Sequence, residues 1–417
     1  MNKRIYLCLA HMSPNGAEQK YIKEAFETNW VVPLGPNVNA FEEDIRQFIG
    51  QSKEVVALSS GTAAVHLSLI GCGVGPGDEV LTQSFTFCAS AHPVVYLGAT
   101  PVFVDSEPGT WNMDPDLLEE AVKDRIRKTG HKPKVIMPVS LYGMPYRIDK
   151  ILEVASRYDI PVVEDAAEGF GSQFDGQRLG TFGRYGVLSF NGNKMITTSG
   201  GGALVCPDKE SKDKMMFYAT QAREAFPYYQ HEEIGYNYRM SNICAGIGRG
   251  QMTVLEEHIA HHRHLYELYR ELLHDVDGIE VHGDDADPRL RSNFWLNTIT
   301  IDPLLRIKGQ ENAYGSSVQT AVGGVASVVH SSGQARTDCE PNDNVEALRM
   351  ALDKAGIESR PLWKPMHKQP VYQHAPAYVN GVSESLFHKG LCLPSGPCVS
   401  DDDARYIVSH IKQSIEP

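Results

Sequence analysis

Short apolar runs alternate with helical patterns through the first half of this chain, and that alternation restricts the fold more than any other feature. Strands are expected at residues 54–58, 79–81, 100–105, 134–140, 160–165, 188–190 and 202–205. Helices are expected at 63–70, from 86 onwards, at 114–127 and at 149–158. Strands that stay apolar along their length are buried on both faces, as in a parallel sheet covered by helices. The sequence therefore predicts an α/β fold whose ligands bind beyond the carboxyl ends of the strands.

A single lysine, Lys194, lies among small and polar residues between two of these strands. The segment from 189 to 202 reads Ser-Phe-Asn-Gly-Asn-Lys-Met-Ile-Thr-Thr-Ser-Gly-Gly-Gly. Most of the 39 lysines and arginines must be solvated surface charges. Here the small neighbours and flanking strands instead predict a cramped pocket. A buried lysine loses its proton readily and can then form a Schiff base with a carbonyl group.

Small hydroxyl residues follow the strand at 54–58 and directly precede a helical pattern. Ser60, Gly61 and Thr62 would place backbone N–H groups and a positive helix end where an anion could bind. An ordinary helix N-cap explains the same residues. The glycine-rich stretch at 71–78 follows a helix rather than a strand, so it is expected to be a turn and not a dinucleotide site.

Together these residues supply what pyridoxal 5′-phosphate (PLP) requires. Ser60, Thr62 and Ser189 could hold its phosphate, and Lys194 could bind its aldehyde. Asp165, at the end of its strand, could pair with the pyridine nitrogen and keep the ring able to accept electrons. Each residue alone is a weak signal, but their order on one alternating scaffold points to a PLP enzyme.

Length and composition limit the other possibilities. A chain of 417 residues suggests two or three domains. With 39 Lys+Arg against 52 Asp+Glu, the net charge of −13 disfavours nucleic acid as a partner. No apolar run approaches the ~18 residues that span a membrane, and the first residues are too short a patch for a signal peptide, so a cytoplasmic protein is expected. The eight cysteines show no CxxC and are expected to be reduced thiols.

A long helical pattern at 245–273 carries four histidines, His258, His261, His262 and His264. A solvated helix face explains them better than metal ligation, and no metal is expected.

The character of the chain changes near residue 275. Strands are expected at 279–281 and 294–301, and helices at 345–355 and from 401 onwards. The chain is therefore expected to divide into a large domain, 1–274, and a smaller C-terminal α+β domain, 275–417. Residues 307–343 are rich in small polar side chains and are expected to be a flexible excursion outside the chemistry.

Several motifs resemble the DegT/DnrJ/EryC1/StrS family of nucleotide-sugar aminotransferases. They lie at 59–66, 77–80, 98–105, 164–167, 235–240 and around Lys194, and the resemblance covers nearly the whole chain except 307–343. Within the family, the branch that aminates C4 of UDP-4-keto-6-deoxy-GlcNAc on the way to bacillosamine is similar at 191–202, 220–224, 291–293, 360–363 and 392–396.

The resemblance implies a type I PLP-dependent aminotransferase fold: a large domain with a mainly parallel seven-stranded sheet, and a small C-terminal domain. It also implies a homodimer with active sites at the subunit interface, UDP-sugar and L-glutamate as substrates, and no metal. Lys194 matches the Schiff-base lysine and Asp165 the pyridine partner. The other residues matched to the cofactor are Ser60, Gly61, Thr62, Phe87, Glu168, Ser189, Asn193 and, from the partner subunit, Asn237.

Residues matched to the nucleotide sugar are Asn29, Trp30, Val31, Val32, Arg360, Pro361, Leu362, Trp363 and His367. By sequence alone, the segments that carry them could equally be a connection between two helices and a surface loop around a packed tryptophan. Arg239 is expected to hold an anionic group, either a glutamate carboxylate or a pyrophosphate. Glu168 departs from the family, because many members carry Gln or His there.

Several other functions on this or a related fold are alternatives. A related enzyme could aminate C3, produce a C4 epimer or make a perosamine-type sugar. Dehydratases of the family carry His in place of Lys194, which argues against dehydration. A nicotinamide-linked reductase would need a glycine turn directly after a strand, and a purely structural role would not need Lys194 and Asp165.

Overall fold

A mainly parallel sheet forms the centre of the molecule in the computed structural model, which describes residues 4–310 and 339–416. Parallel bridges between Ile136 and Val162 and between Val139 and Asp165 join its two halves. Within this sheet, the described strands all run in one direction except β9, which is antiparallel to both of its neighbours. In spatial order the strands are β14 (Ala377–Tyr378), β3 (Thr100–Val104), β2 (Glu79–Gln83), β4 (Val135–Met137), β5 (Val163–Asp165), β8 (Tyr185–Ser189), β9 (Gly202–Cys206) and β1 (Glu54–Leu58). The expected seven-stranded arrangement is confirmed, and β14 extends its edge.

Alternate residues of the strands pack into separate cores on the two faces of this sheet. In β1, Val55 and Ala57 join one core, whereas Val56 and Leu58 join the other. This alternation explains why the strands are apolar throughout. The first core contains α2 (Pro36–Phe48), α5 (Pro115–Thr129) and α6 (Ile148–Arg157); the second contains α3 (Gly61–Gly71), α4 (His92–Tyr96) and α7 (Lys209–Ala219).

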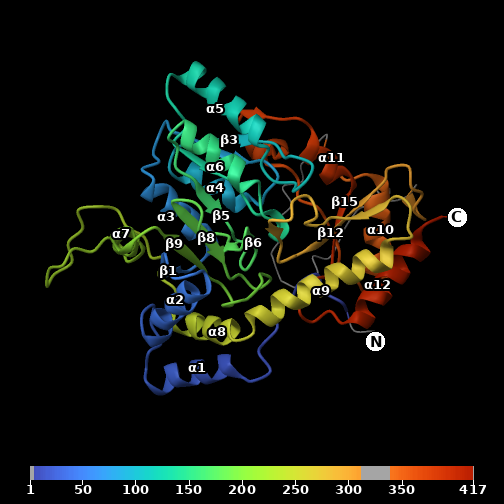
Figure 1. Cartoon of the computed structure of the whole chain (residues 1–417). Coiled ribbons are helices and arrows are strands. Elements are labelled where there is room, and N and C mark those ends of the chain that lie inside the picture. The colour runs from blue at the N-terminus through green and yellow to red at the C-terminus, as the bar shows by residue number, and fades with distance from the viewer. Residues whose placement is uncertain (1–3, 311–338, 417) are drawn as a thin grey trace.

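A smaller antiparallel sheet lies on the other side of the molecule (Figure 1). Its order is β10 (Ile279–Val281), β12 (Asn297–Ile301), β15 (Gly390–Leu393) and β13 (Arg360–Pro361). The long helix α9 (Leu255–Leu273) extends towards it from the central sheet, and its Leu265 and Tyr269 enter the smaller core. The other helices here are α10 (Asp343–Lys354), α11 (Val382–Lys389) and α12 (Asp401–Ser414). β13, β15 and α11 were not predicted.

Two segments beyond residue 274 pair with strands of the N-terminal part. β14 adds to β3, and β11 (Leu290–Arg291) pairs with β6 (Gln173–Phe174), which in turn pairs with β7 (Gln177–Arg178). The domain boundary at residue 274 therefore stays a prediction. Short 3-10 helices complete the fold at Cys88–Ser90, Leu141–Gly143, Met366–Lys368 and Pro370–Tyr372.

Two helices replace the single one expected at 245–273. α8 (Asn242–Met252) packs on α1 (Ala17–Glu27) and ends before Thr253, and α9 begins at Leu255. Most of the expected excursion at 307–343 falls on 311–338, outside the described residues. At its described ends, Ile307 is buried and bridges Ile415, and α10 begins at Asp343.

The expectation of a solvated histidine face on α9 is wrong for two of the four residues. His258 and His262 are 6% and 0% exposed, and their Nδ1 atoms lie 3.3 and 3.0 Å from the carbonyl oxygens of Met195 and Phe294. These histidines pack α9 against the Lys194 loop and the segment that precedes β12. None of the helices in the described part of the chain combines the length and apolar character needed to cross a bilayer.

Burial of His262 predicts a pH-dependent contribution to stability. It lowers the pKa of this imidazole from 6.5 to about 3, so between these values the unfolded chain binds more protons than the folded one. Folding stability should therefore fall as pH drops through this window, by up to ~1.4 kcal/mol per pH unit from this residue. His262→Asn should flatten the dependence in urea unfolding curves, whereas His264→Asn, at an exposed position of the same helix, should not. An unchanged slope in the first variant would contradict this account.

Candidate active site

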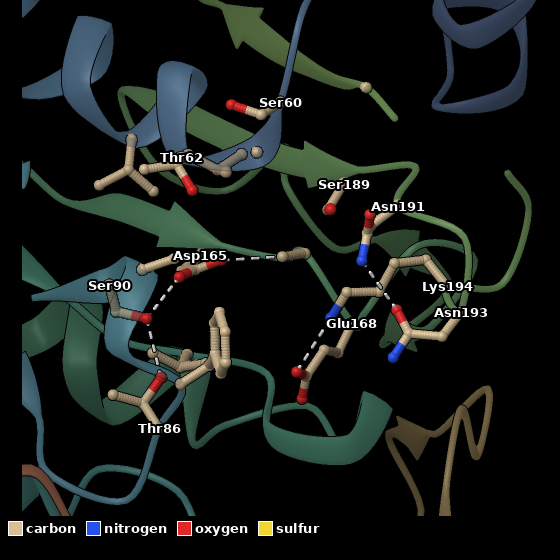
Figure 2. A pocket seen from close by; sticks show the side chains of 18 of the residues that line it. Ser60, Thr62, Thr86, Ser90, Asp165, Glu168, Ser189, Asn191, Asn193 and Lys194 are labelled. Atoms are coloured by element: carbon tan, nitrogen blue, oxygen red, sulfur yellow. Dashed lines mark hydrogen bonds and ion pairs between the residues drawn. The ribbon is translucent and has the colours of Figure 1, made fainter. Parts of the chain in front are cut away.

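A cavity of about 410 Å³ lies at the carboxyl ends of β5 and β8, beside the N-terminus of α3 (Figure 2). The structure brings together here most residues predicted to bind the cofactor. Those lining the cavity are Ser60, Gly61, Thr62, Phe87, Asp165, Glu168, Ser189, Asn193 and Lys194, together with Trp363 from the predicted sugar site.

The N-terminus of α3 forms one wall. Ser60 is the N-cap, and its Oγ accepts the N–H of Ala63 at 3.0 Å. Within the described residues, no acceptor reaches the N–H groups of Gly61 and Thr62. A Cβ on Gly61 would lie 3.0 Å from the Cβ of Ser189, so any other residue would require Ser189 to shift by a few tenths of an ångström. The N-cap interpretation is confirmed. Because the cap leaves two donors that could face an anion, the anion site stays a prediction.

Asp165 ends β5 and is 5% exposed. Its Oδ2 accepts the hydroxyl of Ser90 at 2.6 Å, and its Oδ1 accepts the N–H of Ala167 at 3.2 Å. Ser90 in turn contacts Thr86 at 2.8 Å between hydroxyl oxygens. Burial raises the pKa of Asp165, while the Ser90 bond and the charge of Lys194 oppose that rise. Ser90 and Thr86 were not among the predicted site residues; their only signal is their place at the start of the helix expected after the strand at 79–81.

Lys194 points into the cavity from the loop between β8 and β9. Its Nζ lies 3.1 Å from Glu168 Oε1 and 4.0 Å from the centre of the Trp295 ring. The lysine side chain is only 13% exposed. Trp295 also donates its Nε1–H to the carbonyl of Asn193 at 2.6 Å, which ties the loop to the C-terminal half of the chain. Trp295 was not among the predicted site residues.

Glu168 is buried beneath Lys194. Its second carboxylate oxygen accepts the N–H of Tyr142 at 2.7 Å. Burial raises the pKa of Glu168, and the nearby charge of Lys194 opposes that rise. Glu168, which departs from the family pattern, is thus bonded directly to Lys194, the predicted Schiff-base residue.

Aromatic rings form the outer wall. Phe87 is 54% exposed, and its ring centre lies 5.4 Å from that of Trp363. The backbone N–H of Trp363 donates to the hydroxyl of Tyr142 at 2.9 Å. Phe87 is therefore available to stack on a planar ligand, as predicted.

Arg239 is not where an anion-binding role requires it. Its guanidinium is only 8% exposed, pairs with Glu42 and donates to the carbonyl of Ala57 at 3.0 Å. In this chain Arg239 joins α2 to β1, so its expected role in holding an anionic group has no support from the cavity and stays a prediction. Asn237, expected to act from the partner subunit, is exposed and bridges Thr220 outside the cavity.

The remaining residues predicted to bind the sugar also lie outside this cavity. Asn29, Trp30, Val31 and Val32 form the connection between α1 and α2, and the carbonyl of Trp30 accepts a hydrogen bond from Asn242. Arg360 pairs with Glu358 at 2.9 Å, Pro361 lies in β13, and Leu362 is buried. His367 lies between Ser84 Oγ at 2.6 Å and Glu384 Oε1 at 3.1 Å.

The donor set suits PLP. Two unbonded backbone donors at a helix end can take a phosphate, a buried carboxylate can face a protonated ring nitrogen, and a lysine amine lies in the same cavity. Among residues 4–310 and 339–416, no group of three His, Cys, Asp or Glu side chains could hold a metal ion.

Comparison with known proteins gives the same result. EpsN of Bacillus subtilis (strain 168), named as a pyridoxal phosphate-dependent aminotransferase, is 42% identical over 100% of this chain and 98% of its own. A GDP-perosamine synthase of Escherichia coli O157:H7 is 32% identical over 98% of both chains. The crystal structure of a DegT DnrJ EryC1 StrS aminotransferase from Brucella abortus has a TM-score of 0.80 and 28% identity, covering 96% of this chain and 95% of that one.

The sequence model of one family matches residues 14–322 and 311–412, and so covers most of the chain. The expected type I fold and PLP as cofactor are confirmed by these relationships. The chain therefore belongs to the DegT/DnrJ/EryC1/StrS aminotransferase family and is a PLP-dependent nucleotide-sugar aminotransferase.

Proposed function

We propose that this enzyme moves the amino group of glutamate to C4 of UDP-4-keto-6-deoxy-GlcNAc, yielding a UDP-4-amino-4,6-dideoxy sugar for glycan synthesis. The observation that carries the aminotransferase assignment is the meeting of Lys194 and Asp165 in one cavity beside the N-terminus of α3. The sugar assignment rests on the motifs at 191–202, 220–224 and 360–363, which resemble the bacillosamine branch.

The position of each residue in the cavity indicates its role in the proposed reaction. Gly61, Thr62 and Ser189 would hold the phosphate of the cofactor, and the Asp165 carboxylate would pair with the protonated ring nitrogen. PLP, when bound, supplies an electron-accepting ring that stabilises negative charge next to the carbon that carries the amino group. The Nζ of Lys194 accepts and returns the proton that must move during each half of the reaction. The aromatic wall excludes water from that step.

The GDP-perosamine synthase relative supports a second candidate, a 4-amino sugar carried on GDP. Both candidates require the same use of Lys194 and Asp165. They differ in the nucleotide and in the sugar hydroxyls, so direct comparison of the two ketosugars separates them.

We also propose a homodimer in which a partner subunit completes each site. Phe26, Trp30, Leu34 and Tyr96 are 40–60% exposed, which is unusual for large apolar side chains unless a partner covers them. Asn237 and the connection that contains Trp30 would then reach the neighbouring subunit's site, which accounts for their absence from the cavity of a single chain. A cytoplasmic location, where nucleotide sugars are made, accompanies this proposal.

Lys194→Ala should lower transamination by at least ~10²-fold, because the variant lacks the group that moves the proton. The measurement is the visible absorbance of the bound cofactor after glutamate and then after UDP-4-keto-6-deoxy-GlcNAc, with mass and NMR analysis of the product. Lys209→Ala, at an exposed lysine paired with Asp213, should behave as wild type. Full turnover by Lys194→Ala would refute the role assigned to this lysine. If the wild-type enzyme responds to glutamate but not to UDP-4-keto-6-deoxy-GlcNAc, only the choice of sugar is refuted.

Gly202→Ala should weaken PLP binding at least ~tenfold. Its Cβ would lie 2.5 Å from the carbonyl carbon of Ser60 and closer still to the nitrogen of Gly61, so β9 would displace the phosphate-binding end of α3. Cofactor titration followed by absorbance measures the change. Gly75→Ala, whose Cβ meets open space, is the control, and equal affinities in the two variants would contradict the role given to α3.

Complementation tests the shared site. Lys194→Ala and Asn237→Ala should each be impaired, yet a mixture allowed to exchange subunits should regain roughly a quarter of wild-type activity, because half of the dimers then hold one intact site. Assays before and after exchange measure the gain. If Asn237 served its own subunit, exchange would restore nothing.

A further inference from the structure

The side chain of Lys194 is held at its charged end by two groups that favour a cation. Glu168 Oε1 lies 3.1 Å from Nζ, and the indole ring of Trp295 faces Nζ with its centre at 4.0 Å. A carboxylate and the face of an indole both stabilise an ammonium group. Because the side chains of Lys194 and Glu168 are only 13% and 3% exposed, solvent screens this pair far less than a surface ion pair.

Glu168 is fixed in this position from the other side. Tyr142 adopts a left-handed backbone with φ 54°, and its N–H is bonded to Glu168 Oε2. The next residue, Gly143, has φ 94°, and a Cβ there would overlap Asn293 Oδ1. Asn293 donates its side-chain amide to the carbonyl oxygen of Glu168 at 2.8 Å. A costly backbone conformation thus aims a donor at this carboxylate, which indicates a built position and not a chance contact.

The other titratable groups around the pair do not replace Glu168. Asp165 is already bonded to Ser90 and Ala167. Burial raises the pKa of the Cys8 thiol to about 12 and also raises those of Cys392 and Tyr142, so these groups are neutral at physiological pH. The counter-ion bonded to Lys194 is therefore Glu168.

We propose that Glu168 is a positioning residue whose carboxylate, with the face of Trp295, stabilises the Lys194 amine as an ammonium group once that amine has left the cofactor and taken up a proton. The amine then stays beside the reaction centre with a proton to return, and it does not attack other carbonyl compounds that enter the site. Family members with Gln at this position would lack the charge. The inference rests on the proposed role of Lys194, and it gives that residue a defined resting state.

Reactivity of Lys194 in the full-length, cofactor-free protein tests this directly. Acetic anhydride labels only neutral amines, and peptide mass spectrometry can follow the labelling of Lys194 as pH is varied. In Glu168→Gln the labelling midpoint of Lys194 should move to lower pH, with about tenfold faster labelling at neutral pH for each pKa unit lost. Gln can still accept the Tyr142 N–H, so the fold should be kept, which thermal unfolding can check.

Two further variants serve as comparisons. Glu168→Asp keeps a negative charge and should hold the midpoint closer to wild type than Gln does. Glu153→Gln removes a charge from an exposed pair on α6 and should change nothing at Lys194.

An unchanged midpoint in Glu168→Gln would overturn the proposal. A faster plateau rate at high pH with the same midpoint would also overturn it, because that result means a more open cavity and not the loss of a counter-ion. Labelling requires neither PLP nor sugar, so its result is independent of whether the wild type transaminates.

Discussion

Three carboxylates buried within five residues set the geometry of this active site. Glu164, Asp165 and Glu168 are 0%, 5% and 4% exposed at or just beyond the end of β5. A buried carboxylate without partners costs several kcal/mol, so each must be met by donors from other parts of the chain. Glu164 accepts backbone N–H groups from Gly180, Phe182 and Gly183. Asp165 accepts hydrogen bonds from Ser90 and Ala167, and Glu168 accepts them from Tyr142 and Lys194. The donors that pair with the three carboxylates therefore fix the positions of the turns around them.

The same constraint explains why the catalytic loop lies where it does. Lys194 belongs to the connection between β8 and β9, whose ends are fixed by antiparallel pairing of Ser189 with Gly202. Gly202 then passes so close to Ser60 that a side chain would not fit. One pair of strands therefore positions both the Lys194 amine and the N-terminus of α3, which is the predicted phosphate site.

The sequence predicted the parts of the site that depend on local patterns. Lys194, Asp165 and the Ser60–Thr62 turn follow strands whose apolar runs are unmistakable, so the fold itself brings them to one edge. Ser90, 75 residues from Asp165, and Trp295, 102 residues from Asn193, carry no such pattern.

Partners that are distant in the sequence are not visible in sequence patterns. Arg239 pairs with Glu42, which lies 197 residues away. The expectation that His258 and His262 face solvent is wrong for the same reason, because the carbonyl groups that they contact belong to other segments. Charged and polar side chains are recognised in a sequence as candidate functional groups. Only the tertiary structure shows which of them already pair with other residues of the chain.

The outer part of the cavity differs from its base in polarity and in exposure to solvent. The base is polar and buried, whereas the wall at the opening consists of Phe87 and Trp363, with Phe87 largely exposed. Trp363 is brought there from the C-terminal half by its bond to Tyr142, the same residue whose backbone holds Glu168. Tyr142 thus links Lys194, through Glu168, to the aromatic wall at the opening of the cavity.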